Sequence, residues 1–171
     1  TLWMMDNYKP RMVVGTSYKK LGKQQGTANA WGDWDPEKFT VEDSAFGFVV
    51  MENGATIVLE SSWALNIRNP IEAATTLCGT KGGADMLDDD LKLNYVKNNR
   101  QVVETPDFNA GGVAFYDGEK MDPSELEARL WIDAIINDTE VNTKPEQAIV
   151  VTQILEAIYE SAKTGKPVYL A

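Results

Sequence analysis

The sequence contains no histidine and a single cysteine, Cys78, in 171 residues. Histidine is the most common general acid or base at neutral pH and the most common metal ligand. A Ser-His-Asp or Cys-His nucleophile system is therefore excluded within the chain, and a zinc site is nearly excluded. One cysteine cannot form an internal disulfide framework, and its apolar strand context predicts an inert core side chain. We expect no catalytic residue and no metal site in this chain.

Long hydrophobic runs and basic residues are also scarce. No apolar run approaches the ~20 residues that a membrane-spanning helix requires. Lys and Arg number 16 against 26 Asp and Glu, which gives a net charge of -10. This balance argues against nucleic acid and against an anionic membrane surface, because both attract clustered cations. We expect a cytoplasmic protein, which also fits the low cysteine content, with neither nucleic acid nor a membrane as partner.

The most informative segment, residues 41–63, reads as two β-strands around an Asn53-Gly54 turn. Asn-Gly tolerates positive φ at both positions, as a two-residue type I′ hairpin loop requires. Such a loop fixes the register of the strands. It pairs Glu52 with Ala55, Val50 with Ile57, Phe48 with Leu59 and Phe46 with Ser61. Because side chains alternate along a strand, the inner pairs would share one apolar sheet face that needs a cover.

Further strands are predicted by short runs of apolar and β-branched residues between turn residues. They cover residues 11–21, 71–78, 84–87, 91–96, 101–104 and 168–170. On the first of these strands, one side carries Met12, Val14, Thr16 and Tyr18. Residues 22–40 read as a long polar loop, and a loop of that length in a compact domain tends to be functional or disordered.

Two helices follow, and both have start signals. Asp122-Pro123-Ser124-Glu125 offers an N-cap and a proline at the first helical position, and Thr143-Lys144-Pro145-Glu146 resembles a capping box. Apolar stripes at helical spacing are Leu126, Leu130, Trp131, Ala134 and Ile135, then Ala148, Val151, Leu155, Ile158 and Ala162. Gly165 should end the second helix. Strands first and helices last indicate one α+β domain, a mostly antiparallel sheet with helices on one face.

Five segments carry a resemblance to a known family. They are residues 2–10 (LWMMDNYKP), 41–43 with 52–55 (VED, ENGA), 60–64 (ESSWA), 79–84 (GTKGGA) and 154–168 (ILEAIYESAKTGKPV). In this order they resemble the C-terminal domain of the Gfo/Idh/MocA oxidoreductases, the glucose-fructose oxidoreductase and inositol dehydrogenase family. The resemblance covers essentially the whole chain. It implies a large, open-faced, mostly antiparallel sheet of the glyceraldehyde-3-phosphate-dehydrogenase-like type.

The resemblance also implies an N-terminal Rossmann domain that binds NAD or NADP and is missing from this chain. Residues 1–7 would be the tail of a helix from that region, and residues 8–171 the substrate-binding and oligomerisation domain. The family's catalytic histidine and lysine would lie before Thr1. Residues 79–83 do not form a dinucleotide-binding loop and more simply let the chain reverse between strands. We therefore expect no cofactor site on this chain, which alone should be inactive.

The candidate substrate-binding residues are Trp31, Asp33, Trp34, Asn66 and Arg68. Indole faces stack on the C–H faces of sugars, and carboxylates accept hydroxyl hydrogens. In the family, the loop that contains the two tryptophans tends to lie at the mouth of the active site. The tryptophans can instead anchor the loop on the core or pack in a dimer interface. Arg68 could bind an acidic or phosphorylated sugar, or simply be solvated.

These features predict the C-terminal domain of an NAD(P)-dependent oxidoreductase. Hydride would pass between the nicotinamide and a sugar, cyclitol or related polyol. The alternative is a non-catalytic ligand-binding or scaffold module with the same fold. Face-to-face pairing of sheets predicts a homodimer or tetramer, because a large open sheet needs its second face covered.

Overall fold

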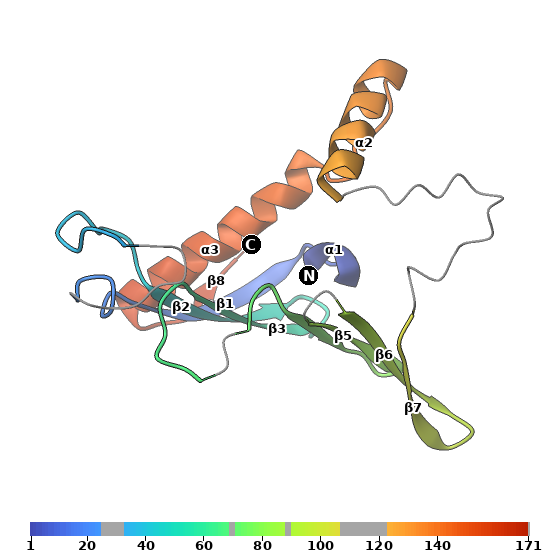
Figure 1. Ribbon diagram of the computed structural model, residues 1–171, viewed down its shortest axis with the longest axis horizontal. Helices are drawn as coiled ribbons and strands as arrows, with labels where there is room; N and C mark the ends of the chain where they lie inside the picture. Colours follow the sequence, from blue (N-terminus) through green and yellow to red (C-terminus); the bar gives the residue numbers. More distant parts are fainter. Residues whose placement is uncertain (25–32, 69–70, 88–89, 107–122, 171) are drawn as a thin grey trace. The chain divides into compact units, whose positions relative to one another are not determined.

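The computed structural model describes residues 1–24, 33–68, 71–87, 90–106 and 123–170 (Figure 1). Its contacts divide the chain into two compact units. The first unit is Thr1–Asn66 with Leu130–Ala171, and the second is Ile67–Arg129. Every strand pairing among the described residues is antiparallel. The α+β class is thus confirmed, with the strands divided between two sheets.

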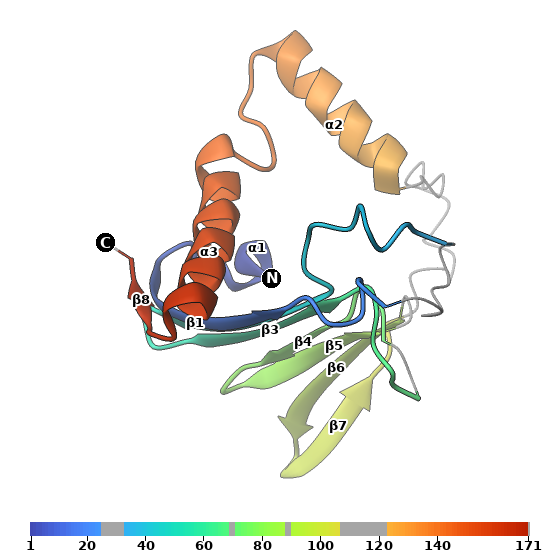
Figure 2. The same ribbon diagram turned by 90° about the vertical axis from the view of Figure 1, so that its left-hand side faces the viewer.

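The first unit is built on a four-stranded sheet in the order β3-β2-β1-β8. The strands are β1 (Pro10–Tyr18), β2 (Ser44–Met51), β3 (Thr56–Ser62) and β8 (Val168–Tyr169). Helix α3 (Pro145–Thr164) lies across one face of this sheet, as Figure 2 shows. The short helix α1 (Leu2–Met5) joins the same core through Leu2.

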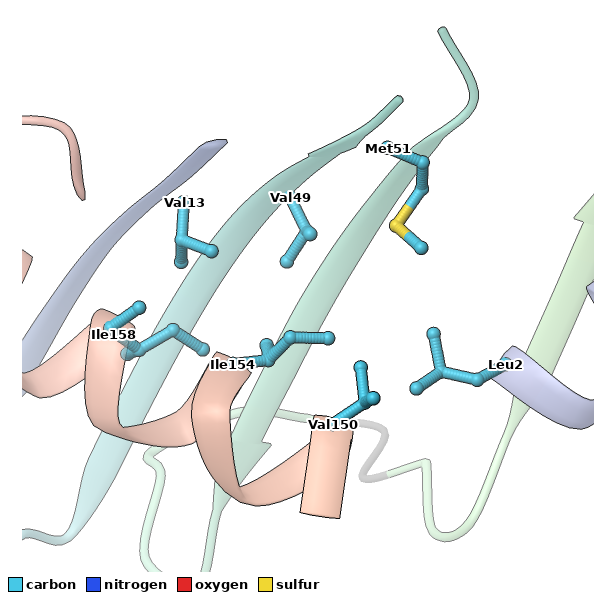
Figure 3. Close-up of a cluster of buried hydrophobic side chains, with 8 residues drawn as sticks. Leu2, Val13, Val49, Met51, Val150, Ile154 and Ile158 are labelled. Atoms are coloured by element: carbon cyan, nitrogen blue, oxygen red, sulfur yellow. The ribbon is translucent and has the colours of Figure 1, made fainter. Parts of the chain in front are cut away.

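The hydrophobic core of the first unit lies between α3 and the sheet (Figure 3). The sheet contributes Val13, Val49 and Met51, each at most 1% exposed. They meet three residues of α3: Val150, Ile154 and Ile158. Burying one such side chain contributes roughly 1.5–3 kcal/mol, so this contact is the main source of stability for the unit.

Two glycines let α3 approach the sheet closely. Gly15 of β1 pairs with Gly47 of β2. A Cβ added at Gly15 would lie 2.7 Å from the side chain of Ile158, and one at Gly47 would lie 2.6 Å from it. The Gly15 N–H donates to Ser161 Oγ of α3 at 3.0 Å. The helix thus satisfies a strand donor located beyond the residues that pair with β8.

The predicted hairpin is present, but its loop is one residue longer than expected. The Met51 N–H donates to the Ala55 carbonyl at 2.8 Å, which leaves three residues in the loop. Of these three loop residues, only Gly54 has positive φ, at 87°. Asn53 Oδ1 accepts the Ala55 N–H at 3.0 Å. The type I′ prediction was therefore wrong, because Asn53 uses its side chain to form the turn and leaves the left-handed position to glycine.

The longer loop shifts the register by one residue. The observed pairs include Val49 with Ile57, Gly47 with Leu59, and Phe48 with Val58. A one-residue shift moves a strand's side chains to the opposite face relative to its partner. The predicted pairs Glu52 with Ala55, Val50 with Ile57, Phe48 with Leu59 and Phe46 with Ser61 were therefore wrong.

The sheet face opposite α3, here called the open face, remains apolar and exposed. Met12, Val14, Thr16 and Tyr18 share one side of β1, as predicted, and because Val13 is buried under α3 that side is the open face. The Tyr18 and Phe46 rings meet there edge to face, with their centroids 6.2 Å apart. Its large exposed apolar residues are Val14, Tyr18, Phe48, Val58 and Tyr169.

The second unit contains a four-stranded antiparallel sheet in the order β4-β5-β6-β7. The strands are β4 (Thr75–Cys78), β5 (Gly82–Leu87), β6 (Asp90–Lys97) and β7 (Arg100–Glu104). The Gly79 N–H donates to the Gly82 carbonyl at 2.8 Å, so residues 79–83 reverse the chain between strands, as predicted. Cys78 is exposed, which corrects the core prediction. It shares a polar face with Thr76, whose hydroxyl donates to Asp85 at 2.9 Å.

The starts of α2 and α3 and the end of α3 agree with the predictions to within one residue. Helix α2 runs over Pro123–Asn137, and α3 ends at Gly165, which has φ of 66°. The N-cap of α3 is Lys144 and not Thr143, because the Lys144 N–H donates to Gln147 Oε1 at 2.9 Å.

The buried stripes of the helices differ from the predicted ones. On α3 the buried residues are Val150, Ile154, Ala157, Ile158 and Ser161. The predicted stripe (Ala148, Val151, Leu155, Ile158 and Ala162) lies beside it around the helix and shares only Ile158. The sheet selects the stripe that fits over its glycine pair. On α2 only Ala134 of the predicted stripe is buried, whereas Leu126, Leu130, Trp131 and Ile135 are exposed.

Candidate functional site

Asp43 is a buried carboxylate just before β2 that holds the start of the long loop between β1 and β2. The residue is 2% exposed. Its Oδ2 accepts the N–H groups of Lys20, Leu21 and Gly22 at 2.5, 2.7 and 3.1 Å. Its Oδ1 accepts the Ser44 hydroxyl at 3.2 Å. Successive backbone N–H groups that converge in this way form a binding site for an anion, which Asp43 itself occupies.

The environment of Asp43 keeps its carboxyl ionised. Burial is the largest influence and raises the pKa, but the hydrogen bonds from Gly22, Leu21, Lys20 and Ser44 together outweigh it. The pKa of Asp43 therefore lies below its ordinary value of 3.8. A charged carboxylate whose oxygens are already hydrogen-bonded is a structural anchor rather than a proton acceptor.

Trp34, Phe39 and Trp63 form an aromatic cluster over the same loop. The centroids of Trp34 and Trp63 are 4.6 Å apart with an interplanar angle of 87°, and Phe39 also lies 4.6 Å from Trp63. The Trp34 indole N–H donates to the Gly22 carbonyl at 2.8 Å. The Trp63 indole N–H donates to the Glu42 carbonyl at 3.0 Å. Trp34 thus anchors the loop, and the part of its ring that is not buried in the cluster remains available to a ligand.

Glu42 connects this loop to helix α3. The Tyr159 hydroxyl donates to Glu42 Oε1. This bond is the largest influence on both groups, and it lowers the pKa of Glu42 and raises the pKa of Tyr159. The positive charge of Lys19 lowers the Glu42 pKa further. The dipeptide Glu42-Asp43 therefore ties together the loop, α3 and the end of β3, where the Trp63 N–H donates to the Asp43 carbonyl at 3.2 Å.

The structure places the predicted site residues unevenly. Trp31 lies outside the described residues. Asp33 is exposed beside the half-buried Trp34. Asn66 and Arg68 are also exposed, and Arg68 belongs to the second unit, whereas the other three belong to the first. Among the described residues, Asp33, Asn66 and Arg68 have no hydrogen-bond or ion-pair partner.

Sequence reasoning did not assign a role to Glu42, Asp43 or Trp63. Their only signal was that they lie in segments that carry the family resemblance. Their contacts come from distant parts of the chain, because Asp43 binds N–H groups that follow β1 and Glu42 binds a tyrosine of α3.

A groove of about 650 Å³ lies between α3 and β8, apart from the loop. Its lining includes Glu156, Glu160 and Lys163 from the exposed side of α3. Tyr159 also lines it, but the Tyr159 hydroxyl already donates to Glu42. The groove offers charged groups and no indole surface, so the loop with its aromatic cluster is the stronger candidate site.

Residues 79–83 do not have the form of a dinucleotide-binding turn. Residues 79–83 join two antiparallel strands, whereas a dinucleotide site needs a glycine-rich turn that leads from a strand into a helix N-terminus. In the same described ranges there is no group of three or more His, Cys, Asp or Glu that could hold a metal ion. Nor does any helix described here have the length and apolar character needed to cross a membrane.

Comparison with known proteins assigns this fold to a family. Residues 7–170 match the family described as "Oxidoreductase family, C-terminal alpha/beta domain". The chain belongs to the Gfo/Idh/MocA oxidoreductase family. Its sheets and helices are those of the family's C-terminal domain.

The Gfo/Idh/MocA chain is 32% identical over 166 residues to D-glucoside 3-dehydrogenase of Escherichia coli (strain K12). The alignment covers 94% of this chain and 42% of that enzyme. The chain thus spans less than half the length of this relative.

Solved structures share the fold at lower identity. One is levoglucosan dehydrogenase in complex with NADH and L-sorbose, with TM-score 0.68, 20% identity, and coverage of 95% of this chain and 45% of that one. Another is an aldose-aldose oxidoreductase from Caulobacter crescentus complexed with glycerol, with TM-score 0.66, 16% identity, and coverage of 95% and 42%. An NAD binding oxidoreductase from Klebsiella pneumoniae has TM-score 0.68, 17% identity, and coverage of 95% and 46%.

Proposed function

We propose that this chain is the substrate-binding and oligomerisation domain of an NAD(P)-dependent oxidoreductase that acts on a sugar, cyclitol or related polyol. The observation that carries the proposal is the 32% identity to D-glucoside 3-dehydrogenase over 94% of the chain. The polyol ligands of two structural neighbours, L-sorbose and glycerol, support the substrate class. In this proposal residues 1–7 end a helix that comes from a preceding cofactor domain, and residues 8–171 form the present domain.

The proposed reaction is hydride transfer between a carbinol carbon of the polyol and the nicotinamide. When the polyol is oxidised, its carbinol hydroxyl also loses a proton, and a base must accept that proton. This chain has no histidine, and its glycine-rich residues 79–83 join two antiparallel strands and so do not form a dinucleotide-binding turn. Its part is therefore to bind and orient the polyol, while the cofactor and the base are supplied by the rest of the protein.

We assign the polyol contacts on this chain to Asp33 and Trp34, and we keep Trp31, which lies outside the described residues, as a third candidate. The Asp33 carboxylate is exposed, so it can accept hydrogen bonds from hydroxyl groups. Trp34 is already fixed by its hydrogen bond to Gly22, so stacking on a sugar costs little additional side-chain entropy. Asn66 and Arg68 are further exposed candidates for hydroxyl or acidic groups of the substrate.

We also propose that the open face of the first unit pairs with that of a second copy. An apolar surface that contains Phe48, Val58 and Tyr169 favours such a cover. A twofold axis would place the same residues on both sides of the interface, which gives a dimer, and a further interface would give a tetramer.

The test of the function is a substrate screen on the intact protein that contains this chain. We expect NAD(P)-dependent turnover of one or more polyols, with KM raised about tenfold in Asp33→Asn by the loss of a charge-assisted hydrogen bond. Asp35→Asn is the matched control, because Asp35 is a surface carboxylate paired with Lys38 at 3.2 Å. No turnover on any polyol, together with saturable polyol binding, would favour the alternative, a non-catalytic binding module.

A further inference from the structure

The loop segment that carries Asp33 and Trp34 is held by a closed circuit of contacts. The Gly22 N–H donates to Asp43 Oδ2 at 3.1 Å, and the Gly22 carbonyl accepts the Trp34 indole N–H at 2.8 Å. Trp34 then packs edge to face on Trp63. The backbone N–H of Trp63 returns to the Asp43 carbonyl at 3.2 Å. Asp43 therefore binds both Gly22 and Trp63, the two residues that hold the Trp34 ring.

We propose that Asp43 is a positioning residue for substrate binding: through the Gly22 peptide it sets the place and orientation of Trp34, without touching the substrate. The proposal rests on the proposed function for the identity of the ligand. Asp43 would act on the polyol indirectly, through its hydrogen bond to Gly22 and the hydrogen bond of Gly22 to the Trp34 ring.

The Gly22 peptide is a suitable link because it is held on every side. A Cβ added at Gly22 would lie 2.5 Å from the ring of Phe39 and 3.2 Å from that of Trp63. Its N–H and its carbonyl are both hydrogen-bonded. The N–H and the carbonyl belong to two successive peptide units joined at the Gly22 Cα, and the rings of Phe39 and Trp63 packed there restrict rotation, so a displacement of the N–H is passed on to the carbonyl that holds the Trp34 indole.

The neighbouring Glu42 contact carries less of this effect. Tyr159 is 47% exposed, and its hydrogen bond to Glu42 lies at the surface, where water competes for the same groups. Asp43 is 2% exposed and its hydrogen bond to Gly22 is buried, so without the carboxylate the Gly22 N–H would lose a hydrogen bond that water cannot easily replace. We therefore expect the carboxylate of Asp43 to dominate the position of Trp34.

The experiment compares Asp43→Ala and Asp43→Asn in the intact protein. Asp85→Ala is the control, because Asp85 is also a structural carboxylate, bonded by Thr76 and Asn94 at 2.9 Å, but lies in the second unit. We expect Asp43→Ala to raise KM for the polyol about tenfold or more while kcat changes less than about threefold. Asp43→Asn, which keeps one acceptor oxygen, should recover most of the loss. Asp85→Ala should leave KM unchanged.

A second measurement separates positioning from simple loss of stability. Hydrogen exchange should accelerate in Asp43→Ala at the amides of Lys20, Leu21 and Gly22 and at the Trp34 indole N–H. A purely structural role would lower the active fraction and hence kcat, and would leave KM unchanged. An unchanged KM, or an unchanged exchange rate at the Trp34 indole, would overturn the proposal. If the unmodified protein turns over no polyol, the proposed function itself fails, which is a different result.

Discussion

Replacement of Gly47 by alanine tests how closely α3 packs on the first sheet. The added methyl would lie 2.6 Å from Ile158 Cδ1 and 3.1 Å from Cγ1, closer than methyl groups normally approach. An extra methyl in a packed core costs about 1–3 kcal/mol. Alanine in a strand interior is better than glycine by roughly 0.5–1 kcal/mol, which offsets only part of this cost. We expect Gly47→Ala to lower the free energy of unfolding by about 1–2 kcal/mol.

A second substitution should relieve this clash selectively. Ile158→Val removes Cδ1, the atom nearest to the new methyl, and by itself costs about 0.5–1.5 kcal/mol. In the double variant the clash is reduced, so its loss of unfolding free energy should be about 1 kcal/mol smaller than the sum of the losses in the two single variants. Gly15→Ala is the control, because its methyl meets Ile158 Cγ2 at 2.7 Å and Cα at 3.0 Å, and valine retains both atoms.

Urea unfolding followed by circular dichroism gives the required free energies. Two results would refute the packing argument. One is additivity: the loss of unfolding free energy in the double variant agrees within about 0.5 kcal/mol with the sum of the losses for Gly47→Ala and Ile158→Val, as for independent sites. The other is an equal rescue of Gly15→Ala by Ile158→Val.

Three further predictions concern charge, turn geometry and assembly. The pKa of Asp43 is lowered, so its stabilisation is complete above 3.8 and is lost as the pH falls through the folded pKa. In urea unfolding over a pH series, the difference in unfolding free energy between the unmodified chain and Asp43→Asn should shrink as the pH falls below 3.8. A difference that stays constant with pH would count against Asp43 as a charged anchor. Gly54→Ala should cost about 1 kcal/mol because φ is 87° and no atom lies near the new methyl, while Gly54→Asn should cost less; equal costs by thermal unfolding would contradict this. Light scattering should find that the unmodified chain is a dimer. Phe48→Asp should dissociate this dimer, whereas Val96→Asp, on the second sheet, should leave it intact. A monomer at high concentration would contradict pairing through the open face.

Local signals in the sequence predicted the elements well, and nonlocal choices were predicted less well. Gly165 and the prolines at the starts of α2 and α3 act through their own backbone, so these two starts and the end of α3 could be read directly. The hairpin register depends on the Asn53 side chain and the three-residue loop, whereas the buried stripe of α3 depends on other parts of the chain. The stripe is selected by the fit of Ile158 over Gly15 and Gly47, which no helical period reveals.

The candidate site shows the same division. Asp33 and Trp34 could be singled out because an acidic and an indole side chain together suit a sugar, and their composition is visible in the sequence. Asp43 could not, because its role depends on three backbone N–H groups contributed by the segment after β1. A buried acidic residue has no sequence signature that separates it from an exposed one.

We propose that this chain supplies the polyol-binding part of an enzyme whose cofactor is held by another part of the protein. The most direct test is to titrate the 171-residue chain with NADH and NADPH while tryptophan fluorescence reports binding, and to repeat the titration with the intact protein. The account predicts saturable binding to the intact protein and none to the chain alone. Saturable micromolar binding of either nucleotide to the isolated chain would contradict it.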